Sequence, residues 1–279
     1  RSSDLNDTGS LVYTNVTEHV KIGDAPADFQ RLAPSFTVSL QPWQEQLLFL
    51  RLMYKSTFRM PTFNDLYYYR LGNRSLRPEK ANEYNMGITW SRSFSSFLNY
   101  LSVTVDGYYN DVTDKIVAFP TTYAWKMANY GKVHVTGMDA TLAAAASLGK
   151  NMVLVVSGGY TWQKAIDLTD ATSKSYKDQL PYTPKHSGNV SAVLEMPWVN
   201  VGYSIVGVSE RYSMSQNIPE NRIDGYMEHT ASLSRNFSFR HCKLRLQAEI
   251  INMTDTQYDV IKYYPMPGRS WRLTGTIEF

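Results

Sequence analysis

Hydrophobic and polar residues alternate along much of this chain, and the pattern is clearest in the last segment, residues 269–279 (RSWRLTGTIEF). Successive side chains of an extended strand point to opposite faces, so alternate positions share one face. One predicted face carries Trp271, Leu273, Gly275, Ile277 and Phe279, and the other carries Arg272, Thr274, Thr276 and Glu278. An exposed strand edge that ends in phenylalanine invites aggregation in a soluble protein. A closed barrel pairs its last strand with its first, so this segment favours a barrel.

The same alternation recurs in ten earlier segments, which with the terminal one predict eleven strands. They cover residues 35–40, 48–55, 83–90, 101–110, 138–144, 152–162, 188–196, 201–205, 227–234 and 243–250. The segment at 138–144 runs into four consecutive alanines, which equally suit a helix. Residues 1–32 are polar and turn-rich, with one short candidate strand at 11–16. We interpret them as an extracellular loop region that precedes a β-domain spanning residues 33–279.

The connections between the predicted strands alternate in length along the chain. Short connections fall near 41–45, 92–97, 148–151, 196–200 and 237–241, and long ones near 59–80, 112–132, 164–185, 212–224 and 255–268. Alternating hydrophobicity alone does not separate a membrane barrel from a soluble sandwich with one wet face. Regular segregation of short and long connections is typical of a membrane barrel, which has tight periplasmic turns at one end and extracellular loops at the other.

The number of strands carries a further prediction about the fold. If Phe279 lies at the periplasmic end, about eleven strands place residues 1–32 outside the cell. Bacterial single-chain barrels have an even number of strands and both termini in the periplasm. The predicted fold is therefore all-β, the C-terminal part of a larger transmembrane antiparallel β-barrel. The chain opens at Arg1 without a signal peptide, which fits a processed or truncated product.

Composition agrees with this prediction and narrows the function. The apolar share is 43% and the chain contains no apolar run near 18 residues, which excludes helical membrane spans. The formal net charge of +3, with both signs mixed, gives no reason to expect a nucleic-acid partner. Twenty tyrosines and six tryptophans suit the aromatic girdles of a barrel, although β-sandwiches also favour tyrosine. A single cysteine, Cys242, allows no internal disulfide.

Motifs for enzymatic or metal chemistry are missing from the sequence. The five histidines show no metal-ligand spacing, and we expect no metal site and no cofactor. They are His19, His134, His186, His229 and His241. No G-x-S-x-G nucleophile motif occurs, so an enzyme is not expected. His229 falls on the predicted lipid face near a strand end, where an amphipathic ring is tolerated.

Five fragments resemble the TonB-dependent outer-membrane receptors. Residues 58–90 look like the strand-loop-strand of that family, in which R-x-P is followed by G-N-x-x-L-x-P-E. The matching residues are Arg59, Pro61, Thr62, Asn64, Leu66, Gly72, Asn73, Leu76, Pro78, Glu79 and Gly87. The other fragments are residues 108–116, 129–139, 182–186 and 251–271. Each fragment is weak alone, but their order and spacing cover roughly residues 34–279.

The resemblance implies a barrel of roughly 22 strands plugged by an N-terminal domain, of which this chain holds about the last eleven strands. It implies transport energised through the TonB complex, which contacts the plug, and localisation in the Gram-negative outer membrane. Plug and upstream strands are absent from this sequence. Phe279 resembles the C-terminal signal read by the barrel-assembly machinery. Arg59 and Glu79 flank one external loop and are candidates for an ion pair, which we interpret as a solvated or lumenal charge pair.

Ligand binding in this family involves extracellular loops, and the corresponding loops here are rich in aromatic residues. The candidate ligand-binding residues are Tyr67, Tyr68, Tyr69, Tyr123, Trp125, Tyr212, Tyr263 and Tyr264. Such rings can stack on a flat, partly apolar chelate, although they equally suit a girdle or loop packing. The tail YYPMPGRSWRLTGTIEF is similar to cobalamin-type and ferric-siderophore receptors. The expected partners are outer-membrane lipid, a small-molecule metal chelate and, as a further candidate, a surface lipoprotein. A passive porin and a soluble β-sheet binding domain are the alternatives.

Overall fold

The computed structural model describes residues 4–5, 11–12, 31–43, 47–69, 71–94, 97–120, 125–149, 151–240 and 242–278. Within the first 32 residues, the backbones of β1 (Asp4–Leu5) and β2 (Leu11–Val12) form a short antiparallel pair. The predictions for Tyr123, Phe279 and most of the loop region 1–32 concern residues outside the described ranges.

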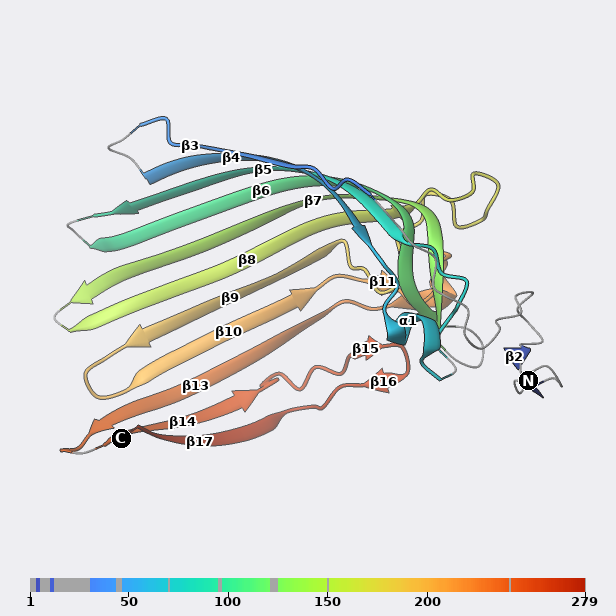
Figure 1. Ribbon diagram of the computed structural model, residues 1–279. Helices are drawn as coiled ribbons and strands as arrows, with labels where there is room; N and C mark the ends of the chain where they lie inside the picture. The colour runs from blue at the N-terminus through green and yellow to red at the C-terminus, as the bar shows by residue number, and fades with distance from the viewer. Residues whose placement is uncertain are drawn as a thin grey trace.

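Eleven strands form one antiparallel sheet that curves into an open arc (Figure 1). Strands that follow one another along the chain lie side by side, from β3 at one edge of the sheet to β17 at the other. The strands are β3 (Ser35–Leu40), β4 (Leu47–Arg59), β5 (Glu79–Ser93), β6 (Leu98–Pro120), β7 (Trp125–Gly149), β8 (Met152–Asp167), β9 (His186–Glu195), β10 (Asn200–Val208), β13 (Tyr226–Ser238), β14 (Lys243–Ile251) and β17 (Ser270–Glu278). In the described part of the chain β3 and β17 do not pair with each other, so the sheet is a segment of a barrel wall.

The remaining elements all lie in the long connections, which gather at one end of the sheet (Figure 1). They are α1 (Phe63–Tyr67), β11 (Arg211–Tyr212), the 3₁₀-helix η1 (Pro219–Asn221), β12 (Arg222–Ile223), β15 (Asp259–Ile261) and β16 (Tyr264–Pro265). The strand ends that flank the five short connections lie at the opposite end. Among the described residues, no helix has the length and hydropathy needed to cross a membrane.

The eleven predicted strands are all present, and the alanine run belongs to a strand. Residues 143–146 lie within β7 and pair with both β6 and β8, because tertiary pairing overrides the helix propensity of alanine. One prediction about connections was wrong. Residues 112–132 are not a long loop but the extended ends of β6 and β7, which pair as far as Pro120 and Trp125. Asp114 takes a φ of 54° there, and the hydrophobic alternation is lost around it.

The two faces of the sheet differ in chemistry, as the alternation predicts. The inner face carries polar cross-strand contacts, including Arg51–Asp106 at 2.8 Å, Thr161–Asp139 at 2.6 Å and Arg272–Glu249 at 2.6 Å. The outward face carries large exposed apolar side chains; Leu273, for example, is 81% exposed. The described residues of this face thus show the apolar surface that a lipid-facing barrel wall requires.

Aromatic residues gather on the outward face toward the end with the long connections. Three tyrosines there each donate to, or accept from, the ring nitrogen of a histidine on the next strand. The O···Nδ1 distances are 3.2 Å for Tyr109–His134, 2.7 Å for Tyr160–His186 and 2.7 Å for Tyr203–His229. Amphipathic rings of this kind are enriched where a membrane meets water. The expected position of His229 on the apolar face is therefore confirmed by its strand register with Ile205.

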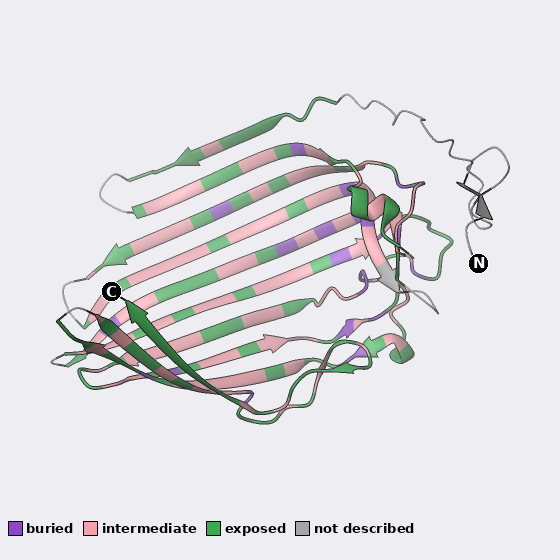
Figure 2. Cartoon of the chain, turned by 60° about the horizontal axis from the view of Figure 1, so that its bottom comes forward, coloured by how far each residue is buried: buried purple, intermediate pink, exposed green. Residues whose placement is uncertain are grey.

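Buried apolar residues are concentrated near the long connections rather than along the whole sheet (Figure 2). One cluster consists of Val112, Val133, Val135, Ala165 and Leu180. A second consists of Leu76, Ile116 and Met127, with Leu66 and Leu71 packed against it. Each cluster joins a strand end to a loop, so these clusters fix the loops against the sheet.

Candidate functional site

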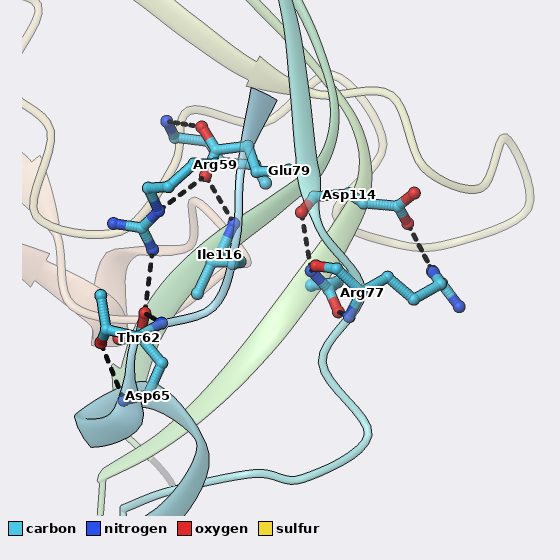
Figure 3. Close-up of polar contacts among 9 residues, drawn as sticks. Arg59, Thr62, Asp65, Arg77, Glu79, Asp114 and Ile116 are labelled. Carbon is cyan, nitrogen blue, oxygen red and sulfur yellow. Dashed lines mark hydrogen bonds and ion pairs between the residues drawn. The ribbon is translucent and has the colours of Figure 1, made fainter. Parts of the chain in front are cut away.

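The connection between β4 and β5, residues 60–78, is held in place by charged and polar contacts at both of its ends. Thr62 caps α1 by accepting from the Asp65 N–H, while the Asp65 carboxylate accepts from the Thr62 N–H (Figure 3). Arg59 lies 3.4 Å from Asp65 and 3.8 Å from Glu79. Glu79 also lies 3.7 Å from Lys115 and accepts from the Ile116 N–H at 3.0 Å. The predicted pairing of Arg59 with Glu79 is confirmed as part of this network.

A second set of contacts ties the same connection to the ends of β6 and β7. Arg77 pairs with Asp114 at 2.6 Å (Figure 3). The Asn129 side chain bridges the two segments. Asn129 accepts from the Arg77 N–H at 2.8 Å and donates to the carbonyls of Arg77 and Asp114 at 3.0 and 2.7 Å. The Met127 N–H donates to the Leu71 carbonyl at 2.9 Å. Residues 60–78 are therefore folded onto the sheet rather than projecting from it.

The other long connections interlock in the same way. The Trp125 ring packs on Tyr182 with centroids 5.5 Å apart, and the Tyr182 N–H donates to the Tyr212 carbonyl at 2.7 Å. Arg211, only 4% exposed, donates to the Asp259 and Val260 carbonyls at 2.6 and 3.1 Å. These contacts link the connections 168–185, 209–225 and 252–269. We call these three connections, together with residues 60–78, the loop crown.

A stacked tyrosine pair anchors the crown to the sheet. The rings of Tyr226 and Tyr258 stack 3.9 Å apart, and the Tyr258 hydroxyl donates to Glu228 at 2.5 Å. Burial, together with the neighbouring Glu228 carboxylate, raises the pKa of Tyr258 well above its usual range. Tyr258 is therefore a neutral hydrogen-bond donor at physiological pH.

The structure places the predicted aromatic residues in three groups around the crown. Tyr67, Tyr68 and Tyr69 lie at the end of α1, and Tyr69 is 79% exposed. Trp125 and Tyr212 both contact Tyr182, so these two predicted residues lie close together. Tyr263 and Tyr264 lie at the turn between β15 and β16, and Tyr263 is 82% exposed. The crown therefore presents solvent-accessible rings at α1 and at the β15–β16 turn.

An inner cavity of about 320 Å³ lies where the crown meets the inner face of the sheet. Its apolar floor comes from Val112, Val135, Ala165 and Leu180, with the Tyr108 ring lying over Gly137. The polar groups around it are Glu79, Glu83, Asn110, Lys115, Gln163 and Thr183. Glu79 is engaged by Arg59 and Lys115, whereas Glu83 has no ion-pair partner in the described part of the chain. The buried Asn110 Oδ1 accepts no hydrogen bond from any described residue.

Apart from Glu79, the polar groups of this cavity were not among the residues singled out from the sequence. Glu83 and Asn110 are register partners on β5 and β6, and both occupy inward positions of the alternating pattern. That inward position was visible in the sequence. Their closeness to Gln163 of β8 and Thr183 of the following connection was not, because it depends on sheet curvature and loop folding. Among the residues that the structure describes, no group of histidine, cysteine or acidic side chains is arranged to hold a metal ion.

An antiparallel barrel wall with an apolar outward face, a polar inner face and folded loops at one end is the architecture of a transmembrane β-barrel. Residues 4–253 match the family model described as TonB dependent receptor-like, beta-barrel. The chain belongs to this family, and the resemblance noted in the sequence is confirmed.

Individual proteins of this family can be compared with the chain. It is 25% identical over 230 residues to the vitamin B12 transporter BtuB of Photobacterium profundum. That alignment covers 80% of this chain and 34% of BtuB. Among solved structures, the ferric citrate transporter FecA aligns with a TM-score of 0.67 at 16% identity, covering 87% of this chain and 37% of FecA. The siderophore receptor PiuA from Acinetobacter baumannii aligns with a TM-score of 0.65 at 19% identity, and the alignment covers 88% of this chain and 35% of PiuA. This chain thus spans about a third of these proteins.

Proposed function

We propose that the protein containing this chain is an outer-membrane receptor for TonB-energised uptake of a bulky, scarce nutrient, a corrinoid in preference to a ferric siderophore. In this proposal residues 33–279 are the C-terminal part of the barrel, and residues 1–32 belong to an extracellular loop. The TonB complex acts on a plug domain encoded upstream, and Phe279 serves the barrel-assembly machinery. The protein is not an enzyme, and the metal chelate is its cargo.

The observation that carries this proposal is the loop crown, which has exposed tyrosines and adjoins an inner cavity with polar groups in its wall. Flat, partly apolar ligands bind well to aromatic side chains, while a few polar groups orient them. Tyr69 and Tyr263 offer accessible rings on separate parts of the crown. A crown fixed by ion pairs and buried contacts loses little entropy when a ligand binds, which supports capture of a scarce ligand.

The charge of the inner cavity supports a corrinoid over an anionic iron complex. Among the described residues the buried Asn110 Oδ1 accepts no hydrogen bond, and the half-buried Glu83 carboxylate has no ion-pair partner, whereas Glu79 engages Lys115. An unpartnered buried acceptor costs free energy unless a ligand supplies a donor. The peripheral carboxamide arms of a corrinoid supply N–H donors, whereas ferric catecholates and ferric citrate bring further negative charge. The cavity, at about 320 Å³, has room for one such arm and not for a whole corrinoid.

Two other functions receive less support from the same observations. A passive porin needs an open lumen, whereas contacts to the sheet hold parts of the connections 60–78 and 168–185 against its inner side, where they would reduce the width of a lumen. A soluble β-sheet binding domain does not account for the large exposed side chains along the outward face, such as Trp271 and Leu273. The similarity to a vitamin B12 transporter favours the corrinoid further.

Competition binding to the full-length receptor tests the proposal. We expect labelled cobalamin to bind, and unlabelled cobalamin to displace it far better than ferric siderophores do. Tyr69→Ala should weaken binding about two- to tenfold, the loss expected for one stacked ring. Tyr84→Ala on the outward face is the matched control and should leave affinity unchanged. Binding of neither ligand class by the unaltered receptor would disprove the substrate assignment.

Glu83 provides a second arm of the same experiment. Glu83→Gln preserves size and removes the charge that repels anions, so it should improve binding of a corrinoid monocarboxylic acid relative to the parent amide. Equal relative affinities in the two receptors would show that the inner cavity does not contact the ligand.

A further inference from the structure

Two segments far apart in the chain carry the same pattern on the outward face. Residues 91–95 read SRSFS and residues 234–238 read SRNFS. The first closes β5 and the second closes β13, and each strand then enters a short connection. In a membrane barrel the short connections lie on the periplasmic side. Arg92 and Arg235, near the ends of these strands, therefore lie at the boundary between the outward face and the periplasmic rim.

Both arginines have the same surroundings. The Arg92 guanidinium lies 5.2 Å from the centre of the Phe94 ring, and the Arg235 guanidinium lies 4.9 Å from the centre of the Phe237 ring. Trp90 and Leu233 occupy the outward positions two residues earlier, so each arginine follows apolar, lipid-facing side chains. Neither arginine forms an ion pair with a carboxylate among the described residues.

An unpaired cation on a lipid-facing surface is costly away from the interface and tolerable only near it. The phenylalanine ring attracts the guanidinium to its face, which restricts the side chain while the N–H groups at the guanidinium edge stay available. The guanidinium is planar, always charged, and presents a fork of donors that matches a phosphate group. The repeated arrangement thus leaves two restrained phosphate-binding groups at one level of the outward face.

We propose that Arg92–Phe94 and Arg235–Phe237 are two binding sites for the phosphate of anionic phospholipids in the periplasmic leaflet. Five strands, β6 to β10, separate β5 from β13. Six inter-strand steps of about 4.8 Å place the sites about 29 Å apart along the sheet. That separation exceeds the width of one headgroup, so each site binds its own lipid. The proposal requires only that the barrel lie in a membrane and does not depend on the transported substrate.

The opposite rim of the outward face provides a matched control. Lys80 and Lys132 are exposed there, and both are in register with Thr113 of β6. Within the described ranges, neither lysine has a ring-face contact like those of Arg92 and Arg235. Removing these two lysines changes the net charge as much as removing the two arginines, but leaves the Arg–Phe arrangement intact.

Native mass spectrometry of the full-length receptor in detergent, titrated with phosphatidylglycerol, tests the proposal. The unaltered receptor should show two sites that prefer phosphatidylglycerol over phosphatidylcholine. Arg92→Gln and Arg235→Gln should each weaken one site about fivefold, and the double variant should weaken both. Arg92→Lys should weaken its site less, because it keeps the charge and loses only the fork. Heat-modifiable migration on gels verifies that each variant is folded.

The control decides between specific and general attraction. The Lys80→Gln/Lys132→Gln double variant should retain both sites at their original strength. Equal weakening by the lysine and arginine double variants would overturn the proposal, because net charge alone would then explain binding. Unchanged phosphatidylglycerol binding in the arginine double variant would also overturn it and leave the arginines as interfacial side chains without a bound lipid.

Discussion

Placing an arginine at the centre of the outward face tests the assignment of the two faces most directly. On β5, Ile88 lies midway between Tyr84 and Arg92, and all three point outward. The eight residue-to-residue steps from Tyr84 to Arg92 span about 27 Å along the strand. A tilt of about 40° reduces this length to about 21 Å across the membrane, close to the 25 Å apolar band of such barrels. Ile88, which is 46% exposed, therefore lies near the middle of the bilayer.

We expect Ile88→Arg to lower the free energy of unfolding by about 2–4 kcal/mol, the cost of an arginine on the lipid face near the midplane. The adjacent Thr89 faces inward, where its hydroxyl lies 3.1 Å from that of Thr104. Thr89→Arg is the control and should cost only about 1 kcal/mol, the loss of one hydrogen bond in a wet lumen. Leu246 is a poorer position for this test, because its register partner Arg235 already reaches the rim.

Equilibrium unfolding in urea, with the full-length receptor inserted in lipid vesicles, measures both variants. The difference should appear as a shift of the midpoint with an unchanged slope, because the surface exposed on unfolding is the same. Equal destabilisation by Ile88→Arg and Thr89→Arg, or a larger effect of Thr89→Arg, would refute the assignment of lipid-facing and lumenal positions.

Three further predictions concern the loop crown and the inner cavity. Asn129→Ala removes three hydrogen bonds and should lower the free energy of local opening of residues 60–78 by about 2–4 kcal/mol. Amide hydrogen exchange in this connection should become faster, and unchanged exchange would contradict the bridging role. The pKa of Tyr258 is raised in the folded protein, so the stabilisation by its neutral hydroxyl is fully present below pH 10 and is lost as pH rises through the higher folded pKa. Tyr258→Phe should therefore reduce the loss of thermal stability at alkaline pH, measured in melting curves. An identical pH profile for the variant would argue against the Glu228 contact. Gly137→Ala should lower the free energy of unfolding by about 1–3 kcal/mol, because the added methyl group displaces the Tyr108 ring. Adding Tyr108→Leu to this variant should restore most of the lost stability, measured by unfolding in urea.

Strand number, strand order and the identity of the two faces could be predicted from the sequence. Alternation has a period of two because neighbouring side chains in a strand point to opposite sides, and this relation needs no knowledge of the rest of the fold. The terminal segment shows it most clearly, since every second residue from Trp271 to Ile277 lies on the outward face. The connections could be assigned as short or long because the alternation stops where a strand ends. The exception is the segment 112–132, where β6 and β7 continue. The alternation fails there around Asp114, so the extended pairing of these strands could not be recognised.

The tertiary structure decided everything that depends on residues distant in the chain. Tyr69 and Tyr263 could be proposed as ligand contacts from their residue type, but their accessibility follows from how the crown folds. Glu83 and Asn110 face one cavity because β5 and β6 align them and a later connection closes over them. A sequence encodes which way each side chain of a strand points. Which loops meet above the sheet depends on curvature and on packing between loops, and these arise only when all the strands are paired.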